Sequence, residues 1–199
     1  MRMHAVCLDL EGVLFPEVWI ALAEKSGIED LKLTTRDVAD YTDLMSRRIR
    51  TLEKAGIGLS TIQGLIAELE PLPGARHFLD RLRETHQVFL VSDTFYEFLP
   101  SISRGLGYPT VFCNNLEVDG DTITGVRLRQ PHGKLRVVEA LQSLKFPVAA
   151  AGDSHNDLEM IRGAEAGALF RAPESIRKLH EDLPALETFE ELEDWIRCL

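Results

Sequence analysis

The stretch Val6-Cys7-Leu8-Asp9-Leu10-Glu11-Gly12-Val13-Leu14 places two carboxylates, two residues apart, at the end of an apolar run and next to a glycine. Burying charge at the end of a strand is unfavourable unless a metal ion or a reaction requires it. A strand that is apolar on both faces is typical of a parallel sheet, in which ligands bind beyond the carboxyl ends of the strands. The stretch therefore predicts a site at this edge of a parallel sheet, with Asp9 and Glu11 in it.

Short apolar segments alternate with longer helical patterns along the 199 residues, which favours an α/β fold with a Rossmann-like parallel sheet. The expected core strands are Ala5–Leu10, Gln87–Ser92, Thr110–Cys113, Val148–Gly152 and Gly167–Phe170. Two further segments, Leu116–Asp119 and Thr122–Leu128, flank Gly120-Asp121 and predict a small β-hairpin insert after the third strand.

The block between the first two strands is too long for a simple crossover, which needs only about a dozen residues. We therefore expect residues 16–70 to form an inserted helical cap over the carboxyl edge of the sheet, and residues 1–15 and 71–199 to form the core. Within the cap, Ser60-x-x-Gln63 has the pattern of a helix start, as Thr188-x-x-Glu191 does for a final amphipathic helix.

Composition excludes several classes of partner. The formal net charge of −10 argues against binding nucleic acid or an anionic membrane, because phosphate contacts need clustered Lys and Arg. The three cysteines are widely spaced and match no zinc pattern, so they are typical of reduced cytosolic thiols. With no signal peptide and no apolar run long enough for a bilayer, the expected location is cytoplasmic. The oligomeric state is left open, a homodimer included.

Asp9 is the candidate nucleophile and Glu11 the candidate general acid and base. A carboxylate can attack phosphorus to give an acyl phosphate when a cation cancels the repulsion between the two anions. Glu11 follows closely enough to protonate a leaving oxygen and then to deprotonate an incoming one. The alternative for the pair taken alone is a solvated acidic turn after a core strand.

Two further segments offer groups that hold an anion. Ser92-Asp93-Thr94 ends the second strand and precedes a predicted helix, where a hydroxyl and backbone N–H groups form an anion site. Lys134 opens another helix and would supply a fixed positive charge. The alternatives are a plain helix N-cap for the first segment and a solvated surface lysine for the second.

The segment Gly152-Asp153-Ser154-His155-Asn156-Asp157 follows another apolar strand. Its two acids, four residues apart at a helix start, supply oxygen ligands suited to Mg²⁺. Ser154 and Asp157 also form a capping-box pattern, so Asp157 is in part structural. His155 is given no role, because a lone loop histidine is more often solvated.

Taken in order, these motifs resemble those of the haloacid dehalogenase superfamily of aspartyl-phosphate phosphotransferases, over nearly the whole chain. The resemblance implies that Asp9 is the nucleophile and that Glu11 is the acid and base, with its backbone carbonyl on the metal. It implies that Asp153 binds Mg²⁺ and that Asp157 supports it. The substrate's phosphoryl group would be bound by Ser92 and Lys134, with Asp93 and Asn156 beside it.

The cap segment narrows the resemblance to phosphoserine phosphatases. Glu17, after Phe15-Pro16, and Arg48, within Met45-Ser46-Arg47-Arg48-Ile49-Arg50, are similar to the residues that recognise the amino acid in that group. A carboxylate can bind the ammonium of a substrate, and a guanidinium can bind its carboxylate in bidentate fashion. Without the resemblance, the arginines would be interpreted as a solvated helix face.

The wider pattern is most similar to a subgroup that both hydrolyses phosphoserine and passes its phosphoryl group to homoserine. Glu11 stands where ordinary phosphoserine phosphatases have Asp, and Asp93 stands where they have glycine, and the subgroup shares both features. The expected partners are therefore the small molecules phosphoserine and homoserine. The alternatives are another phosphatase of the superfamily, such as an enolase-phosphatase, a dehalogenase proper, or a non-catalytic protein that binds phosphometabolites.

Overall fold

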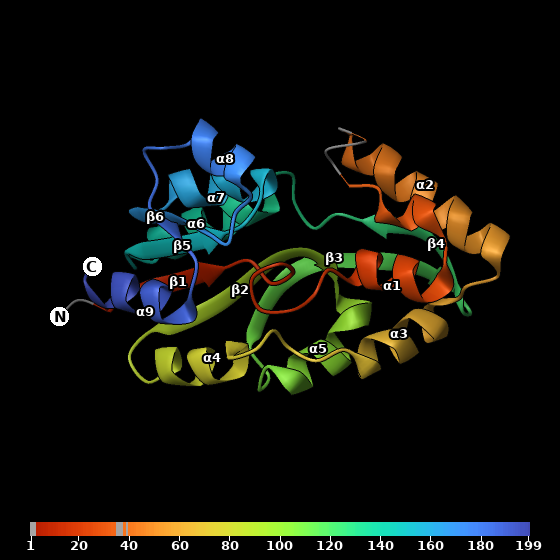
Figure 1. Ribbon diagram of the computed structural model, residues 1–199, viewed down its shortest axis with the longest axis horizontal. Coiled ribbons are helices and arrows are strands. Elements are labelled where there is room, and N and C mark those ends of the chain that lie inside the picture. The colour runs from red at the N-terminus through yellow and green to blue at the C-terminus, as the bar shows by residue number, and fades with distance from the viewer. Residues whose placement is uncertain (1–2, 35–37, 39) are drawn as a thin grey trace.

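A computed structural model of the protein describes residues 3–34, 38 and 40–199. Its centre is one seven-stranded sheet in the order β4-β3-β2-β1-β5-β6-β7, parallel except for the antiparallel pair β3–β4 (Figure 1). The strands are β1 (Ala5–Leu8), β2 (Gln87–Phe95), β3 (Thr110–Asp119), β4 (Thr122–Arg127), β5 (Val148–Gly152), β6 (Ala166–Phe170) and β7 (Ala185–Leu186). The predicted α/β class with a parallel core sheet is confirmed.

Helices connect the strands and cover both faces of the sheet (Figure 1). The α-helices are α1 (Val18–Ser26), α2 (Tyr41–Ala55), α3 (Leu59–Glu68), α4 (Ala75–Arg83), α5 (Leu99–Gly105), α6 (Gly133–Ser143), α7 (Leu158–Gly163), α8 (Glu174–Leu179) and α9 (Phe189–Arg197). The described residues also form the short 3-10 helices η1 (Glu29–Lys32), η2 (Tyr96–Phe98) and η3 (His155–Asp157).

β1 is fully buried because helices pack on both of its faces. Val6 and Leu8 belong to a large apolar cluster that includes α4 and α9, whereas Ala5 and Cys7 pack in a second cluster with α6. A strand buried on both faces has no polar positions to alternate with apolar ones. This burial explains the uninterrupted apolar run before Asp9.

The order of the strands brings the polar motifs to one edge. β1 lies between β2 and β5 and is parallel to both, with Leu8 opposite Leu90 and Ala151. The carboxyl ends of the three strands therefore meet at the same side of the sheet, which is where a ligand binds in sheets of this kind. Residues more than 140 positions apart in the sequence become neighbours there.

The third strand differs from the prediction. The segments expected as a core strand and a separate hairpin arm form one strand, β3, which pairs with β2 in its first half and with β4 in its second. The polar Asn114 and Asn115 lie between the halves without ending the strand, because Arg129 bonds to both side chains and Glu97 accepts from the Leu116 N–H. Hydrogen bonds from residues distant in sequence thus hold Asn114 and Asn115 in a strand, although polar residues at these positions predict that the strand ends.

The helices between β1 and α4 contact the hairpin β3–β4. The Asp121 carboxylate at the hairpin tip accepts hydrogen bonds from the Ser60 N–H at 2.7 Å and the Ser60 hydroxyl at 2.8 Å, while its carbonyl accepts from the Leu59 N–H. The predicted Ser60 cap is therefore wrong: α3 begins at Leu59, and a carboxylate from the hairpin caps it. Gln63 instead donates to the carbonyl of Glu97.

The buried carboxylate of Glu193 connects the C-terminal helix, α9, to α4. Glu193 accepts from Arg81 Nε at 2.8 Å and from Arg197 Nη2 at 2.6 Å. The hydrogen bonds from Arg81 hold the pKa of Glu193 below its ordinary value of 4.5. A carboxyl with a lowered folded-state pKa stabilises the fold above its unfolded pKa, and this contribution is lost as pH falls through the folded value.

We therefore expect Glu193→Gln to lower the melting temperature at pH 7 by roughly 2–6 °C. The difference from the unmodified protein should begin to shrink as the pH falls below 4.5, and it should vanish below the lowered folded-state pKa, where both proteins are neutral at this position. Thermal unfolding followed by circular dichroism over this pH range measures both effects. Glu24→Gln, which removes an equal charge from the exposed face of α1, is the control, and an equal loss in both variants would contradict the assignment.

Cys7, Cys113 and Cys198 are all free thiols, as their spacing predicts. Among the residues that the structure describes, no helix combines the length and the apolar character needed to cross a membrane.

Candidate active site

Asp9 lies just beyond the end of β1, at the centre of the edge where the strand ends meet. The residue is 5% exposed, and its backbone N–H donates to the carbonyl of Ala151 on β5 at 3.0 Å. Gly12 follows with a φ of +80°, and a Cβ at that position would lie 2.6 Å from Asp153 Oδ2. Only glycine lets the chain turn there so close to a second carboxylate.

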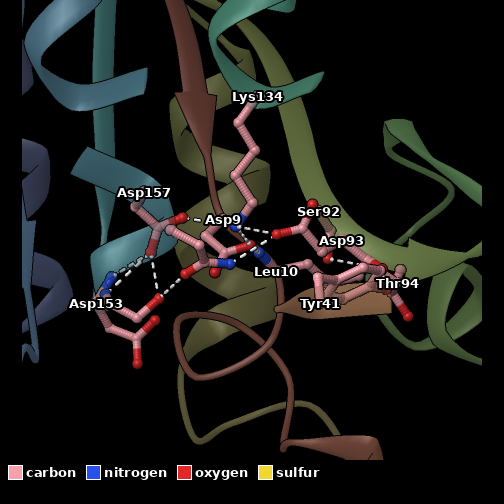
Figure 2. A network of polar contacts seen from close by, with 11 residues as sticks. Asp9, Leu10, Tyr41, Ser92, Asp93, Thr94, Lys134, Asp153 and Asp157 are labelled. Carbon is pink, nitrogen blue, oxygen red and sulfur yellow. Dashed lines mark hydrogen bonds and ion pairs between the residues drawn. The ribbon is translucent and has the colours of Figure 1, made fainter. Parts of the chain in front are cut away.

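Lys134 supplies the positive charge of the site. α6 brings its ammonium to 2.6 Å from Asp157 Oδ1, 2.9 Å from Asp9 Oδ1 and 3.8 Å from Asp93 Oδ2 (Figure 2). Burial disfavours the charge, yet the three carboxylates outweigh it and raise the pKa of Lys134 well above its ordinary value. A lysine that is 5% exposed and permanently charged is a fixed cation for an anionic ligand, and the alternative of a solvated surface lysine is excluded.

Asp9, Asp153 and Asp157 form an acidic group in which one carboxylate oxygen of each lies within 4.8 Å of the others. Burial, followed by the charge of Asp157, raises the pKa of Asp9 well above its usual range and that of Asp153 to about 7. The single charge of Lys134 does not neutralise three acids held this close. A cluster of carboxylate oxygens with excess negative charge is the donor set that a hard divalent cation prefers, so the residues fit such an ion.

Asp157 differs from the other two acids because both of its oxygens have protein partners. Oδ1 bonds to Lys134, while Oδ2 accepts from the N–H groups of Asp153 and Ser154 at 3.1 and 3.0 Å. The predicted capping box of Ser154 and Asp157 is present. The hydrogen bonds of Asp157 thus position both Lys134 and the loop that carries Asp153.

The second strand contributes Ser92, Asp93 and Thr94 to the site. β2 continues to Phe95, so these residues belong to a strand and do not form the amino end of a helix, while the predicted helical segment begins after Phe95 with η2 and α5. Tertiary pairing with β3 extends β2 past the polar residues. Ser92 is buried beside Asp9, and Asp93 Oδ2 accepts from Asn156 Nδ2 at 2.7 Å, which joins β2 to the loop after β5 (Figure 2).

Glu11 connects the sheet edge to the first inserted helix. Its Oε2 accepts from the N–H of Val18, the first residue of α1, at 3.0 Å. Burial, and then the charge of Glu17, raises the pKa of Glu11 to about 7, against the influence of Thr94 and of the Val18 N–H. A carboxyl group with a pKa near neutrality can both donate and accept a proton, as acid–base catalysis requires. The reading of Asp9 and Glu11 as a solvated acidic turn is therefore excluded.

Arg48 lies on α2 and is 8% exposed, which excludes the interpretation of this arginine as part of a solvated helix face. Its Nη2 donates to the carbonyl of Leu33 at 2.8 Å, and its guanidinium stacks on the ring of Trp19 with 4.6 Å to the centroid. Among the residues that the structure describes, none offers a hydrogen-bond partner to its buried Nε. A buried donor without a partner is unfavourable and is expected to bind an acceptor that a ligand brings.

Two acids of the predicted site lie within electrostatic range of Arg48. Burial lowers the pKa of Arg48, and the negative charges of Glu11 and Glu17 act against this, as does Tyr41. Glu17 itself is exposed at the start of α1 and lies close enough to raise the pKa values of Glu11 and Asp153. The structure thus brings Glu17 and Arg48 within electrostatic range of Glu11.

Sequence reasoning missed Trp19 and Tyr41. Trp19 is the aromatic surface under Arg48, and Tyr41 donates a hydrogen bond to the Asp93 carbonyl. A sequence signal for Tyr41 did exist, since residues seven apart share one face of a helix and Tyr41 precedes Arg48 by seven. No comparable signal connects Trp19 to Arg48, because the two lie on different helices.

Comparisons with known proteins agree with this geometry. Residues 3–165 match the family model of haloacid dehalogenase-like hydrolases. The chain is 51% identical over 191 residues to phosphoserine phosphatase ThrH of Pseudomonas aeruginosa, covering 96% of this chain and 93% of that protein. It is 50% identical to a phosphoserine phosphatase of Pseudomonas syringae pv. tomato, covering 96% and 81%.

Among solved structures, a phospho-aspartyl intermediate analogue of phosphoserine phosphatase superimposes with a TM-score of 0.79 at 20% identity over the full length of both chains. That likeness concerns the fold, whereas the family model and the two Pseudomonas relatives concern the sequence itself. On these grounds the chain belongs to the family of haloacid dehalogenase-like hydrolases.

Proposed function

We propose that the protein is a Mg²⁺-dependent phosphoserine phosphatase that works through an aspartyl phosphate on Asp9 and also transfers the phosphoryl group to homoserine. The observation that carries the proposal is the buried Asp9 carboxylate, 2.9 Å from the Lys134 ammonium and beside two further acids. A carboxylate so placed is suited to attack phosphorus. The names of the two Pseudomonas relatives support phosphoserine as the substrate.

The metal would be held by Asp9, the Glu11 backbone carbonyl and Asp153. It would supply positive charge that reduces the repulsion between the Asp9 carboxylate and the phosphate. Asp157 supports this arrangement from behind, because its own oxygens are occupied by Lys134 and the loop N–H groups.

In the first half of the reaction, an Asp9 carboxylate oxygen forms a bond to phosphorus while the bond from phosphorus to the serine oxygen breaks. Lys134, Ser92 and Asn156 bind the phosphoryl oxygens, with Asp93 holding Asn156 in place. Glu11 gives its proton to the departing serine oxygen, which its pKa of about 7 makes possible near neutral pH.

In the second half, Glu11 takes a proton from the acceptor, whose oxygen attacks the phosphoryl group and releases Asp9. Water gives inorganic phosphate, and the hydroxyl of homoserine gives phosphohomoserine. Homoserine is serine with one more methylene, so it suits the site that serine leaves. Glu17 would bind the ammonium group of either amino acid, and Arg48 would bind its carboxylate.

We also propose that residues 16–70 form a cap and that residues 1–15 and 71–199 form the core. α1, α2 and α3 all fall between β1 and α4, outside the sheet, and Arg48 on α2 lies within electrostatic range of Glu11, which follows β1. The free cysteines support a cytoplasmic location for the protein.

The function is tested by incubating the protein with Mg²⁺ and phosphoserine, with and without homoserine, and by following products by phosphorus NMR. We expect inorganic phosphate in both mixtures, phosphohomoserine only when homoserine is present, and neither product when EDTA replaces Mg²⁺. Phosphate alone would reduce the protein to a phosphatase. No turnover of phosphoserine, with hydrolysis of other phosphate esters in a parallel panel, would favour a different substrate such as that of an enolase-phosphatase.

A further inference from the structure

Tyr41, the first residue of α2, makes a direct contact between the inserted helices and the catalytic edge. Its hydroxyl donates a hydrogen bond to the backbone carbonyl of Asp93, 52 positions away, at 3.2 Å. Figure 2 shows the phenol beside Asp93 and Thr94, on the side of the site away from Asp153. Neither the sequence motifs nor the proposed reaction assigns this residue a task.

Tyr41 and Arg48 lie on one face of the same helix. The spacing of four and then three residues places Tyr41, Met45 and Arg48 along a single stripe. Met45 is buried between them, and its sulfur lies 3.7 Å from Arg48 Nη1. Asp40 caps α2 by accepting from the Asp43 N–H at 2.9 Å, so the first turn, which carries Tyr41, is held in helical form. The position of Tyr41 therefore helps to determine that of Arg48.

Asp93, which accepts the hydrogen bond from Tyr41, also has contacts of its own within the site. The Asp93 side chain accepts from Asn156 at 2.7 Å, and its Oδ2 lies 3.8 Å from the Lys134 ammonium. The carbonyl that receives the Tyr41 hydroxyl thus belongs to a residue that is fastened to the groups around Asp9. A series of contacts runs from α2 through Tyr41 and Asp93 to the predicted phosphate site.

The phenol stays a hydrogen-bond donor at neutral pH. Burial, and then the charge of Asp93, raises the pKa of Tyr41 above its ordinary value, while Arg48 and Lys134 act in the opposite direction. The hydroxyl of Tyr41 therefore keeps the proton that it donates to the Asp93 carbonyl.

We propose that Tyr41 is a positioning residue for Arg48, and that its hydrogen bond to Asp93 sets the span between the Arg48 guanidinium and the phosphate site. This inference rests on the proposed function, in which Arg48 binds the carboxylate of an amino-acid phosphate. A fixed span selects substrates by the length between their phosphate and carboxylate groups. It favours phosphoserine over phosphohomoserine, which is longer by one methylene but still fits the site as the product of transfer to homoserine.

The test compares Tyr41→Phe with Tyr96→Phe. Tyr96 offers a matched control, because its hydroxyl also donates to a backbone carbonyl, that of Val111, at the same 3.2 Å, but outside the site. In Tyr41→Phe we expect the KM for phosphoserine to rise about 2- to 10-fold, the range that the loss of one hydrogen bond produces. Its preference for phosphoserine over phosphohomoserine as substrate should fall by a similar factor. Tyr96→Phe should leave both quantities unchanged.

Two further readouts separate positioning from general damage. Hydrolysis of p-nitrophenyl phosphate, which has no carboxylate for Arg48, should change less than 2-fold in Tyr41→Phe. Hydrogen exchange should increase at the backbone amides of α2 in Tyr41→Phe and not in Tyr96→Phe. Equal losses on phosphoserine and p-nitrophenyl phosphate, or an unchanged preference between the two amino-acid phosphates, would overturn the proposal.

Failure of the proposed function would look different. In that case the unsubstituted protein itself would show no preference for phosphoserine over p-nitrophenyl phosphate, before any variant is made. The contact would then be judged by hydrogen exchange alone. Unchanged exchange of α2 in Tyr41→Phe would refute a positioning role, and faster exchange confined to α2 would support it.

Discussion

Asp9→Asn is expected to reduce Mg²⁺-dependent turnover of phosphoserine by at least about 10⁴-fold, the scale seen when a catalytic nucleophile is removed. The amide nitrogen and oxygen of asparagine do not attack phosphorus under these conditions, so the acyl phosphate is not formed. Phosphate release with Mg²⁺ present, measured against the unsubstituted protein, gives the size of the loss.

The same substitution is expected to leave the fold intact. Burial and the neighbouring acids raise the pKa of Asp9, which means that its negative charge is unfavourable in the metal-free protein. Lys134 keeps its contact with Asp157 when the charge of Asp9 is removed. The melting temperature of metal-free Asp9→Asn should therefore equal or exceed that of the unsubstituted protein. Asp119→Asn, on the exposed hairpin, controls for the change in charge, and retained turnover in Asp9→Asn would exclude Asp9 as the nucleophile.

Arg48→Ala is expected to lower kcat/KM for phosphoserine by about 100-fold or more, because a charged, hydrogen-bonded contact with the substrate carboxylate is lost. With p-nitrophenyl phosphate, which lacks a carboxylate, the loss should stay within roughly 3-fold. The ratio of the two kcat/KM values is the decisive measurement, since it does not depend on the fraction of protein that is folded.

Arg50→Ala provides the control on the same helix, where Arg50 is exposed and Arg48 is buried. Both variants lose one positive charge, so a general electrostatic effect would appear in both. Equal losses on the two substrates in Arg48→Ala would count against its role in recognising the amino acid. Within the described part of the chain, the buried Nε of Arg48 has no hydrogen-bond partner, which is the structural reason to expect that the losses differ.

The strands that flank the site differ in how well their sequences predict them. β1 and β5 are recognised from the sequence because both are buried on two faces and are therefore uniformly apolar. β5 has the predicted bounds, and β1 ends at Leu8, two residues before its predicted end. β2 extends three residues beyond its predicted end at Ser92, so it includes the polar Asp93 and Thr94 as well as Phe95. The polar side chains face the site, and these residues stay in the strand because β2 pairs there with β3, which the local sequence does not show.

The caps of the helices give the same contrast. The box of Thr188 and Glu191 forms as predicted, because both partners lie within one turn of the chain. The Ser60 cap does not form, because a carboxylate from a hairpin about 60 residues away takes its place. Local patterns predict local hydrogen bonds and are overruled where a distant group competes.

The amino-acid sequence by itself determined the class of fold and the groups that carry the proposed chemistry, because uniformly apolar strands and the polar residues that end them are local features. The motifs around Asp9, Ser92, Lys134 and Asp153 are read without coordinates. Only the tertiary structure decided which hydrogen bonds and ion pairs these groups form with one another. It directs both oxygens of Asp157 to Lys134 and the loop, joins Glu11 to the start of α1, and ties Tyr41 to Asp93. Such contacts join residues far apart in the chain, so they depend on the packing of helices against strand ends and leave no local pattern in the sequence.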